Sequence, residues 1–333
     1  MKSATQNDIA FFNDFFIGLK ASTPQTYKNM TLVPLNDYIE HKVNYISLAE
    51  AIEKDFIIIK EIDKFASVSN LKVVNTSDKN VLILDGEQFI GAKQNRIINA
   101  TVLVPPLSKV IIDVSCVEEG RWAFVSEKFN SSKNMLDFKV RASKMDSVHN
   151  SLRFSHDYKA NQGEIWDDVH DVLLELNVKS GTGALEDAYI NKEDDLKKFT
   201  NEFRLVKKQN GALFFIDGEA VAMEFISLPE IFEANFNKIV KSYALHAIKS
   251  RNKMNESDDF IEDANQFINL FIAADIERYK SIGKGYDFRF EKKNIRASVL
   301  VVDDEIIHFI GFNPKTNKKR KDKWINIRNL PDM

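Results

Sequence analysis

Cysteine is almost absent from this 333-residue chain, which has one, at position 116. No disulfide can therefore form within the chain, and a reducing compartment is the simplest expectation. An excess of either charge is also lacking, because 46 Lys and Arg residues stand against 49 Asp and Glu residues, for a net charge of −3. A dedicated nucleic-acid binder normally carries a basic excess on its contact face, so nucleic acid is not expected as a partner.

Long uninterrupted apolar runs are lacking too. The most apolar N-terminal stretch, "NDIAFFNDFFIGLK", is broken by Asp8, Asn13 and Asp14. It has neither the continuous apolar run of a signal peptide nor the length of a transmembrane helix. The stretch instead predicts an amphipathic helix over residues 6–20 that covers part of the core, with docking on a membrane surface as the alternative. We therefore expect a cytoplasmic protein without a membrane partner.

Motifs for metals and phosphate loops are missing as well. The six histidines show neither HExxH nor Cys-His ligand spacing, and no Walker motif occurs. Cys116 is expected on a core-facing strand position, where a free cysteine usually packs as a small apolar residue. No metal is predicted, and the sequence leaves any cofactor unknown.

The chain contains 44% hydrophobic residues, enough for one large core or two modest ones. Short β runs bounded by turn residues fill 71–114, which is typical of an antiparallel sheet. Helical patterns follow: 162–177, a long charged helix over 183–211, 229–250 and 259–282. A hairpin over 212–226 is expected to turn at Asp217–Gly218, and strands over 286–312 end the pattern.

The predicted fold is α+β, an antiparallel sandwich-like β core flanked by four or five helices. We expect an N-terminal helical extension over 1–25, a single domain over 26–313 and a basic tail over 314–333. A terminal charge run of this kind is usually solvated.

Four hydrogen-bonding side chains occur together at 93–96, directly before an apolar strand. Side chains alternate along a strand, so Gln94 and Arg96 continue the core-facing row of a strand over 94–104. In the next strand, over 110–118, the core-facing row ends at Glu118. Only hairpin registers that keep both core faces together are favourable. Arg96 and Glu118 should therefore face each other or lie one pair apart at the open end of a hairpin, where a cleft is expected.

Two interpretations of this polar cluster remain open. A buried Arg–Glu pair can be purely structural and fix the register with little net gain in stability. Charged groups gathered at a pocket also occur at functional sites. Residue composition alone does not separate the two.

The segment "LDGEQFIGAKQNRIINATVLVPPLSKVIIDVSCVEEGRW" resembles a known family. Its shared motifs are Gly86–Glu87, the run 91–96, the run 116–118 and the run 120–122. The family is the one named for its association with ADP-ribosylglycohydrolases and rhodanese-phosphatase superfamily proteins. The upstream "NMTLVPL" and "YISLAEAIE", and the downstream "NQGEIWDDV" and "GALFFIDGEAVAMEFIS", extend the resemblance over about 26–313. It implies a link to NAD or ADP-ribose, in biological conflict or defence systems, and ADP-ribose-handling enzymes as partners.

The first functional hypothesis is an enzyme that acts on an NAD-derived or ADP-ribosylated nucleotide. Forked guanidinium groups and an ammonium suit a pyrophosphate, an indole can stack on adenine, and amides can bind ribose hydroxyls. A carboxyl group would act as the general acid or base. Arg96, Arg121 and Lys93 would bind the pyrophosphate, and Trp122 would stack on the adenine. Gln94 and Asn95 would bind the ribose hydroxyls. Glu118 or, as second choice, Glu87 would be the general acid or base. Gln162 and Trp166, four residues apart on one helix face, could close the cleft.

Two further hypotheses belong to other classes. A sensor would bind the same nucleotide without turnover, with Glu118 only orienting Arg96. A protein-interaction module would instead use Trp122, Trp166 and the Phe-rich surface. A second well-placed acid, base or nucleophile would favour the enzyme, and none is evident in the sequence.

Overall fold

The computed structural model describes residues 2–62, 69–121, 126–250, 259–293 and 295–313. It confirms the predicted α+β class, with mainly antiparallel strands. The described residues contain eight helices rather than four or five. The predicted basic tail over 314–333 lies outside the described residues.

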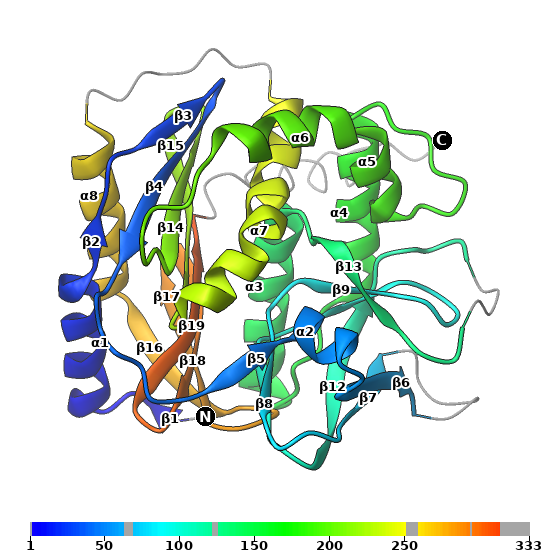
Figure 1. The fold of residues 1–333 in the computed structure, drawn as a ribbon, viewed down its shortest axis with the longest axis horizontal. Helices are drawn as coiled ribbons and strands as arrows, with labels where there is room; N and C mark the ends of the chain where they lie inside the picture. Colours follow the sequence, from blue (N-terminus) through cyan, green and yellow to red (C-terminus); the bar gives the residue numbers. More distant parts are fainter. Residues whose placement is uncertain (1, 63–68, 122–125, 251–258, 294, 314–333) are drawn as a thin grey trace, which may run out of the picture.

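A large antiparallel sheet organises one half of the molecule (Figure 1). Its strand order is β1-β16-β17-β18-β19-β15-β14-β4-β2, and β3 also pairs with β4. The strands are β1 (Lys2–Ser3), β2 (Lys20–Ala21), β3 (Gln25–Tyr27), β4 (Met30–Asn36), β14 (Gly211–Ile216), β15 (Glu219–Ile226), β16 (Asp275–Lys280), β17 (Tyr286–Lys292), β18 (Ile295–Val302) and β19 (Glu305–Phe312).

Two smaller sheets form the other half. The first has the order β13-β9-β10-β12-β7-β6, and the second has the order β11-β8-β5, in which β5 and β8 are parallel. The strands are β5 (Tyr45–Ser47), β6 (Ile57–Glu61), β7 (Asn70–Asn75), β8 (Asn80–Ile83), β9 (Glu87–Ile90), β10 (Arg96–Ile98), β11 (Val102–Val104), β12 (Ser108–Cys116) and β13 (Asn130–Met135).

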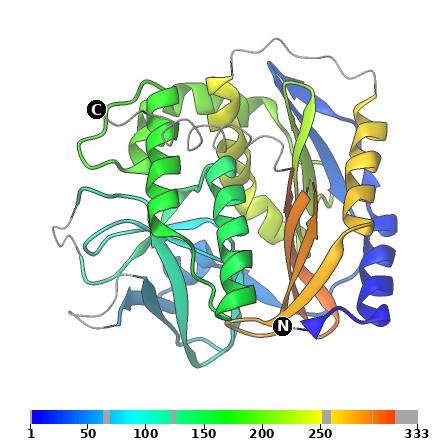
Figure 2. The ribbon, with the colours of Figure 1, turned by 180° about the vertical axis from the view of Figure 1, so that it is seen from behind.

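Helices cover both faces of the large sheet and also pack on the smaller sheets. They are α1 (Gln6–Gly18), α2 (Leu48–Glu53), α3 (Phe138–Phe154), α4 (Gln162–Glu175), α5 (Leu185–Asn191), α6 (Glu193–Glu202), α7 (Pro229–Lys249) and α8 (Phe260–Ile272). Figures 1 and 2 show α1 and α8 side by side on the outer face, with α3, α4 and α7 on the other side, toward the smaller sheets.

Each face has its own apolar core. Phe12, Phe15 and Phe16 of α1 pack with α8 on the outer face of the large sheet, so the predicted amphipathic helix does cover part of the core. Helices α3 to α7 contribute to a second core on the inner face. A third core lies within the smaller sheets and α2. No helix among the described residues is long and apolar enough to cross a membrane.

The central hairpin is only partly as predicted. Strand β10 pairs with β12, and Arg96 lies opposite Cys116, so Glu118 lies one pair further along, in one of the two registers expected. The predicted strand over 94–104, however, is two short strands. Strand β11 leaves β12 and pairs with β8. Side-chain hydrogen bonds of the intervening residues explain the break: Asn99 bonds to the Tyr158 carbonyl, and Thr101 bonds to His308.

Three other boundaries differ from the pattern. The long charged helix over 183–211 is two short helices, α5 and α6, that meet at Lys192. The helix over 259–282 ends at Ile272, and β16 follows it. The 212–226 hairpin is confirmed as β14 and β15, with Asp217 and Gly218 at the turn. The periodicity over 162–177 is also confirmed as α4, whose buried side chains include Ile165 and Val169.

Candidate functional site

The loop between β9 and β10 carries the polar run. At Gly91 φ is +139°, and a Cβ there would lie 2.6 Å from Ser126 Oγ, so the tight course of the loop requires glycine. Ala92 follows at φ 44°. Arg121 donates to the main-chain carbonyl of Ala92 at 3.0 Å and to Asn95 Oδ1 at 3.1 Å. The guanidinium thereby fixes the loop onto the chain that follows β12.

Glu118 holds that guanidinium in place. Its Oε2 is 2.8 Å from Arg121 Nη2 and accepts the main-chain N–H of Asn95 at 3.1 Å. Thr182 donates its hydroxyl to Oε1 at 3.0 Å. Burial opposes ionisation of this carboxyl, but the hydrogen bonds from Arg121, Asn95 and Thr182 outweigh burial and lower the pKa of Glu118. Glu118 is therefore a carboxylate at neutral pH, with its oxygens occupied as acceptors.

Arg96 and Gln94 lie deeper than expected. Neither residue has exposed surface, and Arg96 Nη1 donates to Gln94 Oε1 at 3.2 Å. Gln94 donates in turn to the Glu119 carbonyl at 3.1 Å. Burial lowers the pKa of Arg96, although Cys116, Glu61 and Glu118 oppose that change. These two side chains are part of the interior, whereas Lys93 of the loop and Arg121 of the chain that follows β12 are half-buried cations nearer the solvent.

Gln162 joins α4 to the same strand end. From the first residue of the helix, its side-chain amide accepts the N–H of Cys116 and donates to the carbonyl of Cys116, both at 2.8 Å. The amide thus acts like one residue of a neighbouring strand. Trp166 is half-buried, and its Nε1 is buried without a hydrogen bond to any described residue. Trp122 lies outside the described residues.

The second predicted acid, Glu87, lies in a separate polar group. It is buried and accepts hydrogen bonds from Lys238 Nζ at 3.1 Å and Ser131 Oγ at 3.2 Å. Next to it, Gln88 and Asn134 donate to Glu186 at 2.7 and 2.8 Å. Thr182, which bonds to Glu118, and Glu186, which bonds to Gln88, therefore tie the segment before and into α5 onto the chain after β12 and onto β9.

These partners were missed by sequence reasoning. Thr182, Glu186 and Lys238 come from segments far from the motif, Ser131 lies just beyond its end, and nothing in their local spacing marks them. A site residue can be recognised in a sequence when it belongs to a hydrophobic pattern or to a motif. Single polar residues that tertiary packing brings to the site belong to neither.

A group of buried ions lies behind the motif, in the interior between the sheets. Asp85 accepts from Lys144 Nζ at 2.7 Å, and Arg141 donates to Glu224 Oε1 at 2.7 Å. None of these four residues has exposed surface. Burial lowers the pKa of Lys144 to about 8, with Asp85 acting against that change. Balanced pairs of this kind serve as structural ties between packed elements.

Cys116 behaves as the apolar residue expected of it. The side chain is buried, and burial raises the pKa of the thiol, with Arg96 as a weaker opposing influence. A raised pKa disfavours the nucleophilic thiolate. Within the described residues, no group of His, Cys, Asp and Glu could hold a metal ion.

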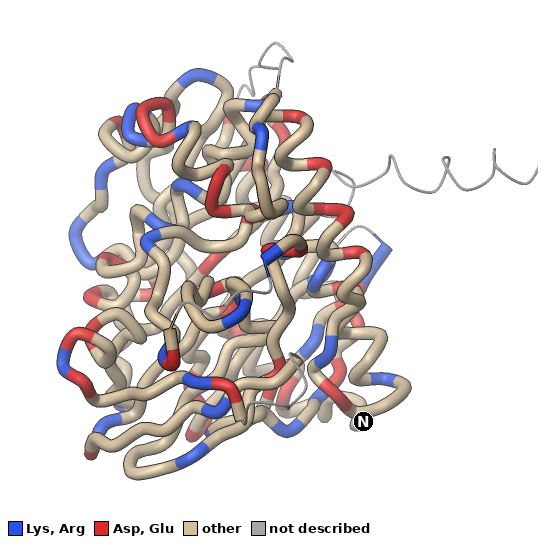
Figure 3. The backbone as a smooth tube through the Cα atoms, turned by 90° about the vertical axis from the view of Figure 1, so that its right-hand side faces the viewer, with Lys and Arg blue, Asp and Glu red and all other residues tan. Residues whose placement is uncertain are grey.

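Along the backbone drawn in Figure 3, positions of Lys and Arg are interspersed among positions of Asp and Glu. The site's own residues follow this pattern, since Arg121 is paired with Glu118, and Lys238 with Glu87. The arrangement can hold the loop in a fixed position, with the half-buried cations of Lys93 and Arg121 at it.

Comparison with known proteins agrees with the motif spacing. The family model described as the ARG and Rhodanese-Phosphatase-superfamily-associated Protein domain matches residues 18–312, where ARG stands for ADP-ribosylglycohydrolase. The match includes the whole polar loop, both smaller sheets and the strands of the large sheet from β2 to β19. No curated protein and no solved structure matches the chain. The chain therefore belongs to the ARG and Rhodanese-Phosphatase-superfamily-associated Protein domain family.

Proposed function

We propose that this protein binds an NAD-derived or ADP-ribose-containing nucleotide at the loop 91–96 and does not convert it. The observation that carries the proposal is the position of Glu118, whose two oxygens are occupied by Arg121, Asn95 and Thr182. A carboxylate held in this way orients its donors. A general acid would instead need a proton near neutral pH, which the lowered pKa of Glu118 disfavours.

The ligand class is supported by charge and by family association. Lys93 of the loop and Arg121, which holds the loop, are half-buried cations, and a pyrophosphate is the part of such a nucleotide that cations recognise. The family name associates the domain with ADP-ribosylglycohydrolases and rhodanese-phosphatase systems. A non-catalytic nucleotide sensor that works beside ADP-ribose-handling enzymes is consistent with both.

Glu87 is not a second candidate for a general acid. Its carboxylate accepts from Lys238 and Ser131, so it too is tied to structural partners. Gln94, Asn95 and Arg96 support the loop from inside. Trp122 remains the candidate for stacking on the ligand's base, and Gln162 and Trp166 remain the candidates for closing the cleft.

Calorimetric titration of ADP-ribose and NAD tests binding. We expect a dissociation constant in the micromolar range, about −8 kcal/mol. Lys93→Gln should weaken it roughly 10-fold through loss of one charged contact, and Arg121→Lys should weaken it as well because the fork is lost. Lys20→Gln, at an exposed lysine on β2, is the matched control and should bind as the wild type does. A folded wild type that gives no heat would contradict the proposal and leave the interaction module.

Incubation with NAD, ADP-ribose and an ADP-ribosylated peptide tests the absence of turnover. Wild type and Glu118→Gln should both return the substrates unchanged. Product formed by the wild type and lost in Glu118→Gln would show that Glu118 takes part in catalysis, and would replace the sensor by the enzyme.

A further inference from the structure

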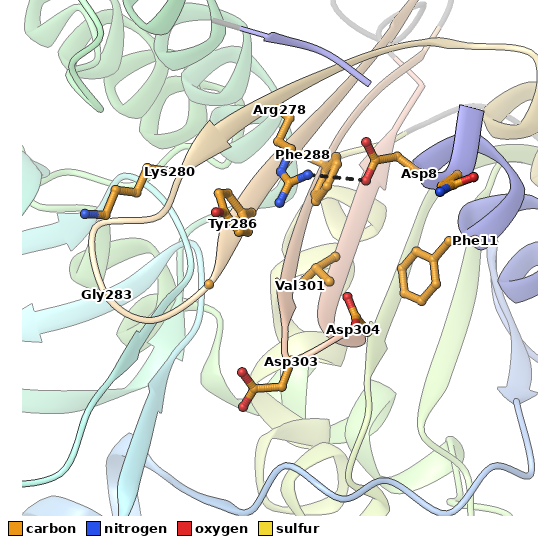
Figure 4. A pocket seen from close by; sticks show the side chains of 12 residues that line it. Asp8, Phe11, Arg278, Lys280, Gly283, Tyr286, Phe288, Val301, Asp303 and Asp304 are labelled. Atoms are coloured by element: carbon orange, nitrogen blue, oxygen red, sulfur yellow. Dashed lines mark ion pairs between the residues drawn. The ribbon is translucent and has the colours of Figure 1, made fainter. Parts of the chain in front are cut away.

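A pocket of about 700 Å³ lies far from the motif, between the N-terminal turn of α1 and the strands β16, β17 and β18 (Figure 4). This volume is within the range of small-molecule sites. The wall contains both charges and aromatic rings, including Phe11, Arg278, Tyr286 and Asp304. Neither the polar loop nor any family motif residue lines it.

Arg278 is held in one orientation. Its Cζ lies 3.7 Å above the ring of Tyr286 and 5.5 Å from that of Phe288. Its closest carboxylate oxygen, Asp8 Oδ1, is 3.7 Å from Nη1, which is beyond hydrogen-bond distance. Among the residues that the structure describes, the guanidinium therefore makes no hydrogen bond. A stacked fork with donors to spare is already arranged for a bidentate anion.

The opposite wall is preformed. In the loop after β16, Lys284 N–H bonds to the Leu103 carbonyl at 2.9 Å. A Cβ on Gly283 would lie 2.2 Å from that carbonyl oxygen, and one on Gly285 would lie 2.1 Å from the Val301 carbonyl oxygen. The loop therefore packs directly on two main chains, and no rearrangement is needed to form the pocket.

Acids occupy the far end of the pocket. Asp303 and Asp304, both exposed, form the turn between β18 and β19, and Lys284 pairs with Asp303 at 2.5 Å. Figure 4 shows Asp304 beside Val301, while the amine of Lys280 points away from Arg278 and toward the other side. At one end of the pocket Arg278 thus offers donors to an anion, beside the carboxylate of Asp8 with which it forms an ion pair at 3.7 Å, and at the other end Asp303 and Asp304 offer acceptors. A simple anion would meet the carboxylates unfavourably.

We propose that this pocket binds a phosphorylated sugar, either free or as part of a ribonucleotide. The phosphate takes the guanidinium fork of Arg278, the sugar hydroxyls donate to Asp304, and the apolar part of the ligand contacts Phe11 and Val301. The pocket geometry alone supports this site, which is independent of the nucleotide proposed for the loop 91–96.

Titrations of ribose 5-phosphate, AMP and inorganic phosphate test the site and separate the two sources of the sugar phosphate. We expect the first two to bind at least 10-fold more tightly than inorganic phosphate. If AMP binds more tightly than ribose 5-phosphate, the ligand is a ribonucleotide; equal affinity indicates the free sugar phosphate. Arg278→Gln should lower the affinity for ribose 5-phosphate and for AMP more than 10-fold. Arg204→Gln, at an exposed arginine after α6, should leave both affinities unchanged.

Asp304→Asn tests the hydroxyl end, because an amide accepts less strongly and removes a negative charge. The substitution should weaken the binding of ribose 5-phosphate and leave the binding of inorganic phosphate unchanged or tighter. Any one of three results would overturn the site. These are a wild type that binds neither sugar phosphate, a folded Arg278→Gln that binds both as the wild type does, and inorganic phosphate that binds as tightly as ribose 5-phosphate. Binding of ribose 5-phosphate without any binding of ADP-ribose or NAD would uphold this site and overturn the function proposed for the loop.

Discussion

The guanidinium of Arg141 donates to both carboxylate oxygens of Glu224, at 2.7 and 3.4 Å, although neither side chain has any exposed surface. Tyr243 donates its hydroxyl to the same carboxylate at 2.5 Å. These residues come from α3, β15 and α7. The pair therefore ties two helices to the large sheet through charge rather than through apolar contact alone.

Breaking this pair should be costly. Glu224→Gln leaves the Arg141 charge buried with a weaker partner, and we expect the free energy of unfolding to fall by about 3 to 5 kcal/mol. Urea denaturation measures it. Glu219→Gln, on the exposed part of the same strand, is the control and should change stability by less than about 0.5 kcal/mol. Equal effects of the two substitutions would show that the buried pair contributes nothing specific.

Gly86 presents a second sensitive position. Its φ is +79°, and a Cβ there would lie 2.7 Å from Arg141 Nε. Gly86→Ala should destabilise the protein by about 1 to 3 kcal/mol through backbone strain, with further loss if Arg141 is displaced. Gly18→Ala offers the contrast, because no atom lies within 4 Å of its position and α1 contains it. That variant should be neutral or up to about 1 kcal/mol more stable, as thermal unfolding would show.

Gln162 should matter for stability more than its half-buried surface suggests. Gln162→Ala removes both hydrogen bonds to the main chain of Cys116 and leaves a buried peptide group without those partners. We expect a loss of about 2 to 3 kcal/mol. Gln266→Ala removes an exposed glutamine that bonds only to Glu262 among the described residues, and should be nearly neutral. If chemical denaturation gives the same midpoint for both variants, the strand-like role of Gln162 is wrong.

Acid should weaken the fold through its buried histidines. Burial lowers the pKa of His308 to about 3 and that of His149 to about 4. The unfolded chain therefore binds protons near pH 6.5 that the folded chain does not bind, so stability falls as pH drops below 6.5. At pH 5 the loss is about 2 kcal/mol for each histidine, from about 1.4 kcal/mol per pH unit.

Unfolding at pH 5, 6 and 7 measures this slope. His308→Gln should reduce it by the share of one histidine. His41 acts in the opposite direction, because hydrogen bonding and charge from Asp37 outweigh burial and raise its pKa; the stability it adds is present below pH 6.5 and is lost as pH rises through the raised value. A wild-type stability that rises toward pH 5 would contradict the net loss expected from His308 and His149.

Periodic segments were the part of this fold that could be predicted. The spacing of Ile165, Val169 and Val172 identifies α4, and Asp217–Gly218 identifies the β14–β15 turn, because local geometry alone decides both. The β10–β11 break could not be predicted in this way. The alternation of residues 94–104 is the same for one strand as for two, and the break depends on Tyr158 and His308, which lie far along the chain.

The candidate site divides in the same manner. Alternation and core faces placed Arg96 either opposite Glu118 or one pair from it, because a slip in register would expose an apolar row, and the structure has the second of these registers. The same reasoning placed Arg96 and Gln94 at the mouth of a cleft, whereas both are enclosed. The burial of the row that contains Gln94 and Arg96 depends on the segment around Thr182 and on α4. No pattern within the motif predicts where those two segments pack.

The pairing of β4 with β14 has a consequence for biosynthesis. Val33 lies opposite Leu213, so at about 5 to 20 residues per second the ribosome needs roughly 10 to 35 s to deliver the second strand after the first. During that interval β4, buried along its whole length in the finished protein, has left the exit tunnel without its neighbour. The large sheet can be completed only after β19 has been synthesised, and nascent-chain chaperones would be needed most for β4 during the interval before β14 emerges.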